Sequence, residues 1–136
     1  MNYLLDTCVV SEEISPKPDG RVSAWLDSVD AQSLYLSVVT LTEIRFGILR
    51  LPEGSKKIRL EDWFVRVVLR LPRERFLPVD DVVALQAASL IGQSKDRELA
   101  DIYIAATAIV RGLTVITRNT GDFQFHGLKV FDPWQR

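Results

Sequence analysis

Four residues of the chain could together hold a metal ion: Asp6, Glu43, Asp101 and Asn119. Three are carboxylates, and no cluster of histidine and cysteine competes with them, because the chain has only one residue of each type. Carboxylates about 4 Å apart repel by up to roughly 4 kcal/mol per pair at an effective dielectric of 20. A hard divalent cation, Mg²⁺ or Mn²⁺, offsets this repulsion, because such ions prefer oxygen ligands. The chemistry indicated is metal-assisted hydrolysis of a phosphodiester.

The segment that positions two of these residues is 99–123, LADIYIAATAIVRGLTVITRNTGDF. Residues 102–110 are almost all apolar or small, which is typical of a helix buried in the middle of a domain. Asp101 begins this helix among apolar neighbours, so its charge needs a partner. Gly112 ends the helix, and residues 113–117 predict a buried strand. The polar loop that follows contains Asn119 and lies where α/β sheets bind their ligands.

Strands alternate with helices along the rest of the chain. The pattern predicts strands at 2–5, 33–38, 75–79, 113–117 and 128–131, and helices at 8–14, 21–29, 40–51, 56–71 and 81–95, followed by the buried helix that ends at Gly112. This alternation predicts a three-layer α/β/α sandwich around a mostly parallel central sheet of four to five strands. No repeat or linker divides the chain, so we expect residues 1–136 to form one domain.

The topology should bring the four candidate residues together. The end of each parallel strand and the start of the following helix share one edge of the sheet. Asp6 ends the first strand, Glu43 lies early in the helix after the second, and Asp101 and Asn119 flank the 113–117 strand. Two of the acids also have a structural explanation. Asp6 suits a helix N-cap. Thr40 and Glu43 form a capping box, which is the favoured interpretation of Glu43 taken alone.

Composition indicates a soluble, cytoplasmic, globular protein without a membrane segment. The 136 residues are 47% hydrophobic, and the single cysteine, Cys8, excludes an intramolecular disulfide. The net charge of −1 does not resemble that of a simple nucleic-acid binder. However, residues 45–75 hold nine Lys and Arg against four Asp and Glu, a surplus of +5. Such a run is typical of a solvated helix face, and it also permits a surface that follows phosphates.

The predicted helix at 56–71 has more apolar residues than one core-facing stripe requires. Core packing explains most of them. The excess around Trp63 and Phe64 indicates a surface for a partner.

Several motifs resemble the PIN-domain ribonucleases, and most closely the VapC and FitB-like toxins of toxin–antitoxin modules. The matching pieces, in order, are LLDTCVVSE at 4–12, LTEIRFG at 41–47, ADIYIAATA at 100–108, GLTVITRNTGDF at 112–123 and VFDPW at 130–134. Each motif alone is weak, whereas the set covers essentially the whole chain at compatible spacing.

The resemblance implies a PIN-like α/β/α fold and hydrolysis of RNA by a metal-activated water, with Mg²⁺ or Mn²⁺ as the ion. It implies a metal site built on Asp6, Glu43 and Asp101, with Asn119 at a less constant fourth catalytic position. Three further residues match supporting positions: Thr7, Thr117 and Asp122. It also implies a homodimer, or a larger hetero-oligomer with the antitoxin, and inhibition by a cognate VapB- or FitA-like antitoxin.

Two departures from the family pattern affect these expectations. Cys8 stands where the family usually has Asn or Ser, which predicts the loss of a polar bond near Asp6. Asn119 leaves the fourth position neutral, which favours one metal ion over two. The leading hypothesis is an active toxin endoribonuclease, and the alternative is a catalytically weak protein that binds RNA or antitoxin. A nuclease directed at DNA is disfavoured, because 136 residues leave no room for an added DNA-binding element.

Overall fold

The computed structural model describes residues 1–94 and 96–135, and its centre is a five-stranded sheet. The strands are β1 (Tyr3–Leu5), β2 (Leu34–Ser37), β3 (Phe76–Leu77), β4 (Thr114–Ile116) and β5 (Lys129–Phe131). Their order is β3-β2-β1-β4-β5, and every pair is parallel. The predicted parallel sheet is therefore confirmed, with β1 in its centre.

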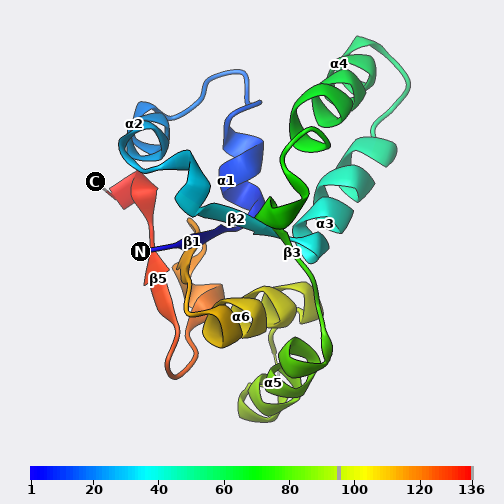
Figure 1. Cartoon of the computed structure of the whole chain (residues 1–136). Coiled ribbons are helices and arrows are strands. Elements are labelled where there is room, and N and C mark those ends of the chain that lie inside the picture. The colour runs from blue at the N-terminus through cyan, green and yellow to red at the C-terminus, as the bar shows by residue number, and fades with distance from the viewer. Residues whose placement is uncertain (95, 136) are drawn as a thin grey trace.

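Helices cover both faces of the sheet (Figure 1). One face carries α6 (Leu99–Arg111), and α5 (Asp81–Gln93) packs against α6. The other face carries α1 (Thr7–Glu12) and α2 (Gly20–Ser28), together with a 3₁₀ turn at Pro133–Gln135. The helices α3 (Val38–Leu49) and α4 (Ser55–Trp63) form a pair that projects from the sheet.

The period-two alternation of strand residues produces two cores. Leu4 and Val115 face α6, which contributes the fully buried Ile104. The next residues along the same strands, Leu5 and Ile116, face the opposite side with Trp25 of α2. A third cluster lies between α3 and α4. The sheet therefore lies between two apolar layers, one on each face.

The largest difference from the predicted helices lies at 56–71, and the ends of the other helices differ from the predicted ones by at most two residues. The predicted helix at 56–71 ends at Trp63, and the chain continues in a π-helical turn over Phe64–Val68, where Leu69 N–H donates to Phe64 O at 2.9 Å. The β-branched valines in this turn are weak α-helix formers. The predicted helix at 81–95 ends at Gln93, and Lys95 lies outside the described residues.

The proposed partner surface around Trp63 and Phe64 needs a correction. Phe64 is buried, because it packs against Ile44 and Ile48 of α3, and Trp63 is partly buried against the same cluster. The exposed apolar side chains of this region are instead Ile58, Val65, Val67 and Leu69.

Gly112 ends α6 as the sequence predicts. Its φ of 69° is in the left-handed region that favours glycine. The Leu113 N–H then donates to Ala108 O at 2.8 Å, which closes the last turn and directs the chain into β4. Over the described residues, no helix is both long enough and apolar enough to cross a bilayer.

Candidate functional site

The strand order places a ligand site beside the end of β1. After β1 the chain crosses to β2 on one side, whereas β4 lies on the other side of β1. Such a reversal opens a crevice outside the carboxyl ends of the two strands. A hollow of about 340 Å³ lies there, and ten residues line it: Asp6, Thr7, Cys8, Glu43, Asp96, Arg97, Glu98, Asp101, Asn119 and Asp122.

Asp6 follows β1 directly, and its side chain is only 5% exposed. One carboxylate oxygen accepts the Thr7 N–H at 2.8 Å, so Asp6 caps α1 as well as facing the hollow. The other oxygen accepts the Thr117 hydroxyl at 2.8 Å. Burial raises the pKa of Asp6, and these hydrogen bonds act in the opposite direction by stabilising the carboxylate. Asp6 is thus held in one orientation by Thr7, at the start of α1, and by Thr117, which follows β4 (Thr114–Ile116).

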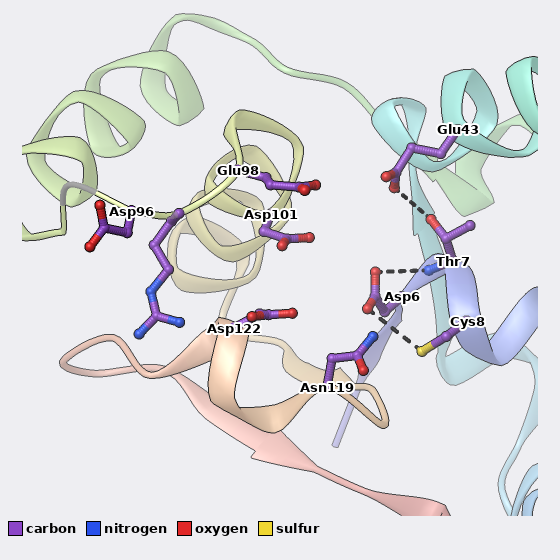
Figure 2. A pocket seen from close by; sticks show the side chains of 10 residues that line it. Asp6, Thr7, Cys8, Glu43, Asp96, Glu98, Asp101, Asn119 and Asp122 are labelled. Atoms are coloured by element: carbon purple, nitrogen blue, oxygen red, sulfur yellow. Dashed lines mark hydrogen bonds between the residues drawn. The ribbon is translucent and has the colours of Figure 1, made fainter.

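Glu43 does not form the predicted capping box. Ser37 caps α3 by accepting the Val39 N–H at 3.0 Å, so α3 begins before Thr40 and Glu43 lies in its second turn. The Glu43 carboxylate instead accepts the Thr7 hydroxyl at 2.6 Å (Figure 2). Thr7 therefore links α1 to α3, and Glu43 is turned toward Asp6.

Asp101 lies in the first turn of α6, as predicted. Figure 2 shows Asp101, Glu98 and Asp122 directed across the hollow toward Asp6 and Glu43. Burial, followed by the negative charges of Asp6, Asp122, Glu43 and Glu98, raises the pKa of Asp101 to about 7. The pocket therefore concentrates negative charge that its own hydrogen bonds do not neutralise.

The loop after β4 supplies the fourth predicted position. The Asn119 N–H donates to the Thr117 hydroxyl oxygen at 3.0 Å, and that hydroxyl donates to Asp6. Asn119 and Asp122 are both exposed at the rim of the hollow. The buried Thr117 thus connects the loop to Asp6. All seven residues predicted for the site, including Thr7 and Asp122, lie in or directly against one hollow.

Cys8 does not leave the gap that was expected beside Asp6. Its thiol lies 3.7 Å from a carboxylate oxygen of Asp6 and 3.6 Å from the hydroxyl oxygen of Thr117. The backbone N–H of Arg118 donates to the sulfur at 3.5 Å. Burial raises the pKa of the Cys8 thiol, which favours the neutral form that can donate. The thiol therefore makes weak polar contacts at this position.

Sequence reasoning missed three residues that line the hollow: Asp96, Arg97 and Glu98. Glu98 is at the N-cap position of α6, yet its side chain makes no capping hydrogen bond. The sequence signal that could have identified Glu98 is its spacing, because it precedes Asp101 by three residues, about one helical turn. Arg97 donates to Gly121 O and to Ser94 Oγ and lies over the Phe125 ring, so it braces the 120–123 turn. Asp96 points away from the other acids (Figure 2).

The donor set fits a hard divalent cation in its chemistry. In residues 1–94 and 96–135, no acid of the hollow forms an ion pair with a Lys, Arg or His side chain. Over the same residues, no three Asp, Glu, His or Cys side chains are already grouped closely enough to hold an ion. Water ligands suit such an open arrangement, since Mg²⁺ usually keeps several of its waters. The unpaired, repelling carboxylates are what such an ion would neutralise.

Fold and hollow together define a parallel α/β protein with an acidic, oxygen-rich site at the reversal of its strand order. The chain belongs to the PIN-domain family, whose profile matches residues 3–125.

The similar proteins cover nearly the whole chain. "Toxin FitB" of Neisseria gonorrhoeae is 44% identical over 135 residues, which are 96% of this chain and 97% of FitB. "VapC ribonuclease Y4jK" of Sinorhizobium fredii is 38% identical over 136 residues, which are 97% of each chain. The crystal structure of FitAcB from Neisseria gonorrhoeae superposes with a TM-score of 0.89 at 42% identity, covering 98% of this chain and 99% of that one.

Proposed function

We propose that this chain is the toxin of a type II, VapBC-like toxin–antitoxin module and that it hydrolyses RNA phosphodiester bonds as a metal-dependent endoribonuclease. The observation that carries the proposal is the acidic hollow at the edge of a PIN-domain sheet. Of the similar proteins, FitB is named a toxin and Y4jK is named a VapC ribonuclease. We treat residues 1–136 as a single PIN domain, acting in the cytoplasm where RNA is available.

The proposed metal ligands are Asp6, Glu43 and Asp101, with Mg²⁺ or Mn²⁺ as the ion. When bound, the ion would activate water and neutralise charge that develops on the phosphate. The chain's own contribution is orientation. Thr7 and Thr117 hold the carboxylates of Glu43 and Asp6 in place through bonds of 2.6 and 2.8 Å. Such preorganisation keeps ligands from relaxing away from the reacting group.

Asn119 and Asp122 complete the proposed site at its exposed rim. Asn119 is fixed at its backbone by the Thr117 hydroxyl, so its neutral amide is available to a substrate or to a water ligand. Asp122 lies on the same side of the hollow as Asp101, and its negative charge acts on Asp101 (Figure 2). Because the fourth position is neutral, we propose that one metal ion is enough.

The proposed partners are a cognate VapB- or FitA-like antitoxin, the RNA substrate and a second copy of this chain. FitAcB and a "Toxin-antitoxin complex from Klebsiella pneumoniae" are solved complexes with chains of this fold. We propose a homodimer that the antitoxin converts to a larger hetero-oligomer.

The alternative function is a PIN-fold protein that binds RNA or antitoxin and has negligible turnover. The observation in its favour is that no three potential ligands are grouped closely in the described part of the chain. This alternative predicts binding that does not depend on a divalent ion.

The test combines ion binding with cleavage. Mg²⁺ or Mn²⁺ should raise the melting temperature of the parent chain in a concentration-dependent way, and the rise should be lost in Asp101→Asn. Asp27→Asn, which changes an exposed acid of α2 outside the hollow, is the matched control. Cleavage of total RNA is then mapped from new 5′ ends. Equal cleavage by the parent chain and Asp101→Asn contradicts the assignment of Asp101, and no cleavage by either favours the alternative.

A further inference from the structure

An exposed aromatic side chain lies one helical turn beyond Glu43 on α3. Phe46 is 59% exposed, whereas Ile44 and Ile48 of the same helix are buried. At 100° per residue, Phe46 lies about 60° from Glu43 around the helix and about 4.5 Å farther along its axis. The ring is therefore on the same side of α3 as Glu43, one turn farther along the helix and outside the lining of the hollow. Packing of the domain does not account for its exposure.

A basic side chain accompanies this ring. The Arg50 guanidinium lies 5.5 Å from the centre of the Phe46 ring and is itself exposed. It is about 20° from Glu43 around the helix and about 10.5 Å along it. Within the described part of the chain, Arg50 makes no ion pair. Glu43, Phe46 and Arg50 thus form a row that runs from the hollow along α3.

We propose that Phe46 and Arg50 form a nucleotide subsite for single-stranded RNA, in which the ring stacks on a base and the guanidinium contacts a phosphate. Proteins bind single-stranded nucleic acids mainly through stacking of bases on aromatic rings and electrostatic contact with the phosphates. The inference rests on the proposed function, because it specifies how the same substrate is held next to the hollow.

Charge favours RNA over another copy of this chain as the occupant. Arg50 belongs to the segment 45–75, which has a surplus of five positive charges. In an isologous dimer through this face, each copy would present its exposed Arg50 to the same face of the other copy. An RNA strand brings one negative charge per nucleotide, which complements Arg50 and the neighbouring segment.

The experiment measures binding without cleavage, by fluorescence anisotropy in EDTA at low salt. The probes are a labelled ten-nucleotide oligoadenylate and an abasic oligomer of the same length and charge. Phe46→Ala should weaken binding of oligoadenylate about fivefold or more and leave the abasic oligomer unchanged. Phe46→Trp should retain binding. Arg50→Ala should weaken both oligomers and reduce the slope of log K against log salt by about 0.7.

Leu49→Ala is the matched control, because Leu49 is 50% exposed on the same helix but about 120° from Glu43. It should change neither affinity. The proposal is overturned if the parent chain binds neither oligomer, if Phe46→Ala weakens both oligomers equally, or if Phe46→Ala only changes the molar mass measured by light scattering. The last result would assign this face to contact between copies. Because the assay needs neither metal nor turnover, its outcome is separate from the cleavage test of the proposed function.

Discussion

Replacing Asp101 by Asn should stabilise the metal-free protein at alkaline pH. In the unfolded chain this carboxyl titrates near 3.8, and in the folded protein its pKa is raised to about 7 by burial and by the neighbouring acids. The folded state therefore binds the proton more tightly, so stability falls as pH rises from about 4 to about 7. Above that range the ionised Asp101 opposes folding in full, and Asn removes the charge.

The magnitude follows from the difference between the two pKa values. One pKa unit corresponds to about 1.4 kcal/mol, so a change from 3.8 to about 7 corresponds to about 4 kcal/mol at most. Asp101 is only partly buried, and solvent screening reduces the expected gain to roughly 1–2 kcal/mol. For a domain of this size, that gain raises the melting temperature by roughly 3–10 °C.

The assay is thermal unfolding in EDTA at low ionic strength, at pH 5 and pH 8, for the parent chain and Asp101→Asn. The gain at pH 8 should shrink at pH 5, where the native carboxyl is mostly protonated. Asp27→Asn should show no comparable gain, since Asp27 is exposed and lies outside the hollow. If Asp101→Asn is equal to the parent or less stable at pH 8, the acids do not repel in the folded state and the electrostatic argument fails.

Three further substitutions test other parts of the structure by urea denaturation. Thr117→Val should cost about 1–3 kcal/mol near neutral pH, because the buried Asp6 loses a hydroxyl donor at 2.8 Å. Thr40→Val should be neutral or up to about 1 kcal/mol stabilising, because the buried Thr40 hydroxyl has no partner among the described residues. Gly112→Ala should cost about 1–2 kcal/mol, because φ is 69° there.

For each of these three substitutions, a different outcome would contradict the prediction. Unchanged stability in Thr117→Val would mean that the Asp6 carboxylate does not depend on that hydroxyl. A clear loss in Thr40→Val would indicate that water or another group satisfies the hydroxyl. A stable Gly112→Ala variant would mean that the end of α6 adapts to a right-handed conformation without cost.

The position of the site at the carboxyl edge of the sheet could be predicted from the sequence, because it depends on the order of strands and helices and not on their exact boundaries. A polar residue that follows a strand lies at the carboxyl edge of the sheet even when the strand is one or two residues shorter than expected. Asp6 and Asn119 were located in this way, and both line the hollow. The buried helix also predicted that Asp101 lacks an ordinary solvated environment, and Asp101 is partly buried in a hollow lined by other acids.

Local rules failed where tertiary contacts compete with them. Thr40 and Glu43 have the spacing of a capping box, yet Ser37 starts α3 earlier and Thr7 binds the carboxylate. That bond joins residues 36 positions apart, so no local pattern announces it. Glu98 was missed because an acid at the start of a helix is normally explained by its favourable interaction with the helix N-terminus.

The bond between Asp6 and Thr117 also bears on how the protein is made. The two residues are 111 positions apart, and β1 is bordered on one side by β4. A chain emerging from the ribosome therefore presents Asp6 early, but it cannot orient this carboxylate until the segment after Gly112 has been synthesised and paired with β1. Truncated translation products that end between Glu43 and Asp101 contain two of the three proposed ligands, and no product that stops before β4 has the Thr117 hydroxyl that fixes Asp6. The proposed ribonuclease activity should accordingly appear only after the segment that follows Gly112 has been synthesised and has paired with β1.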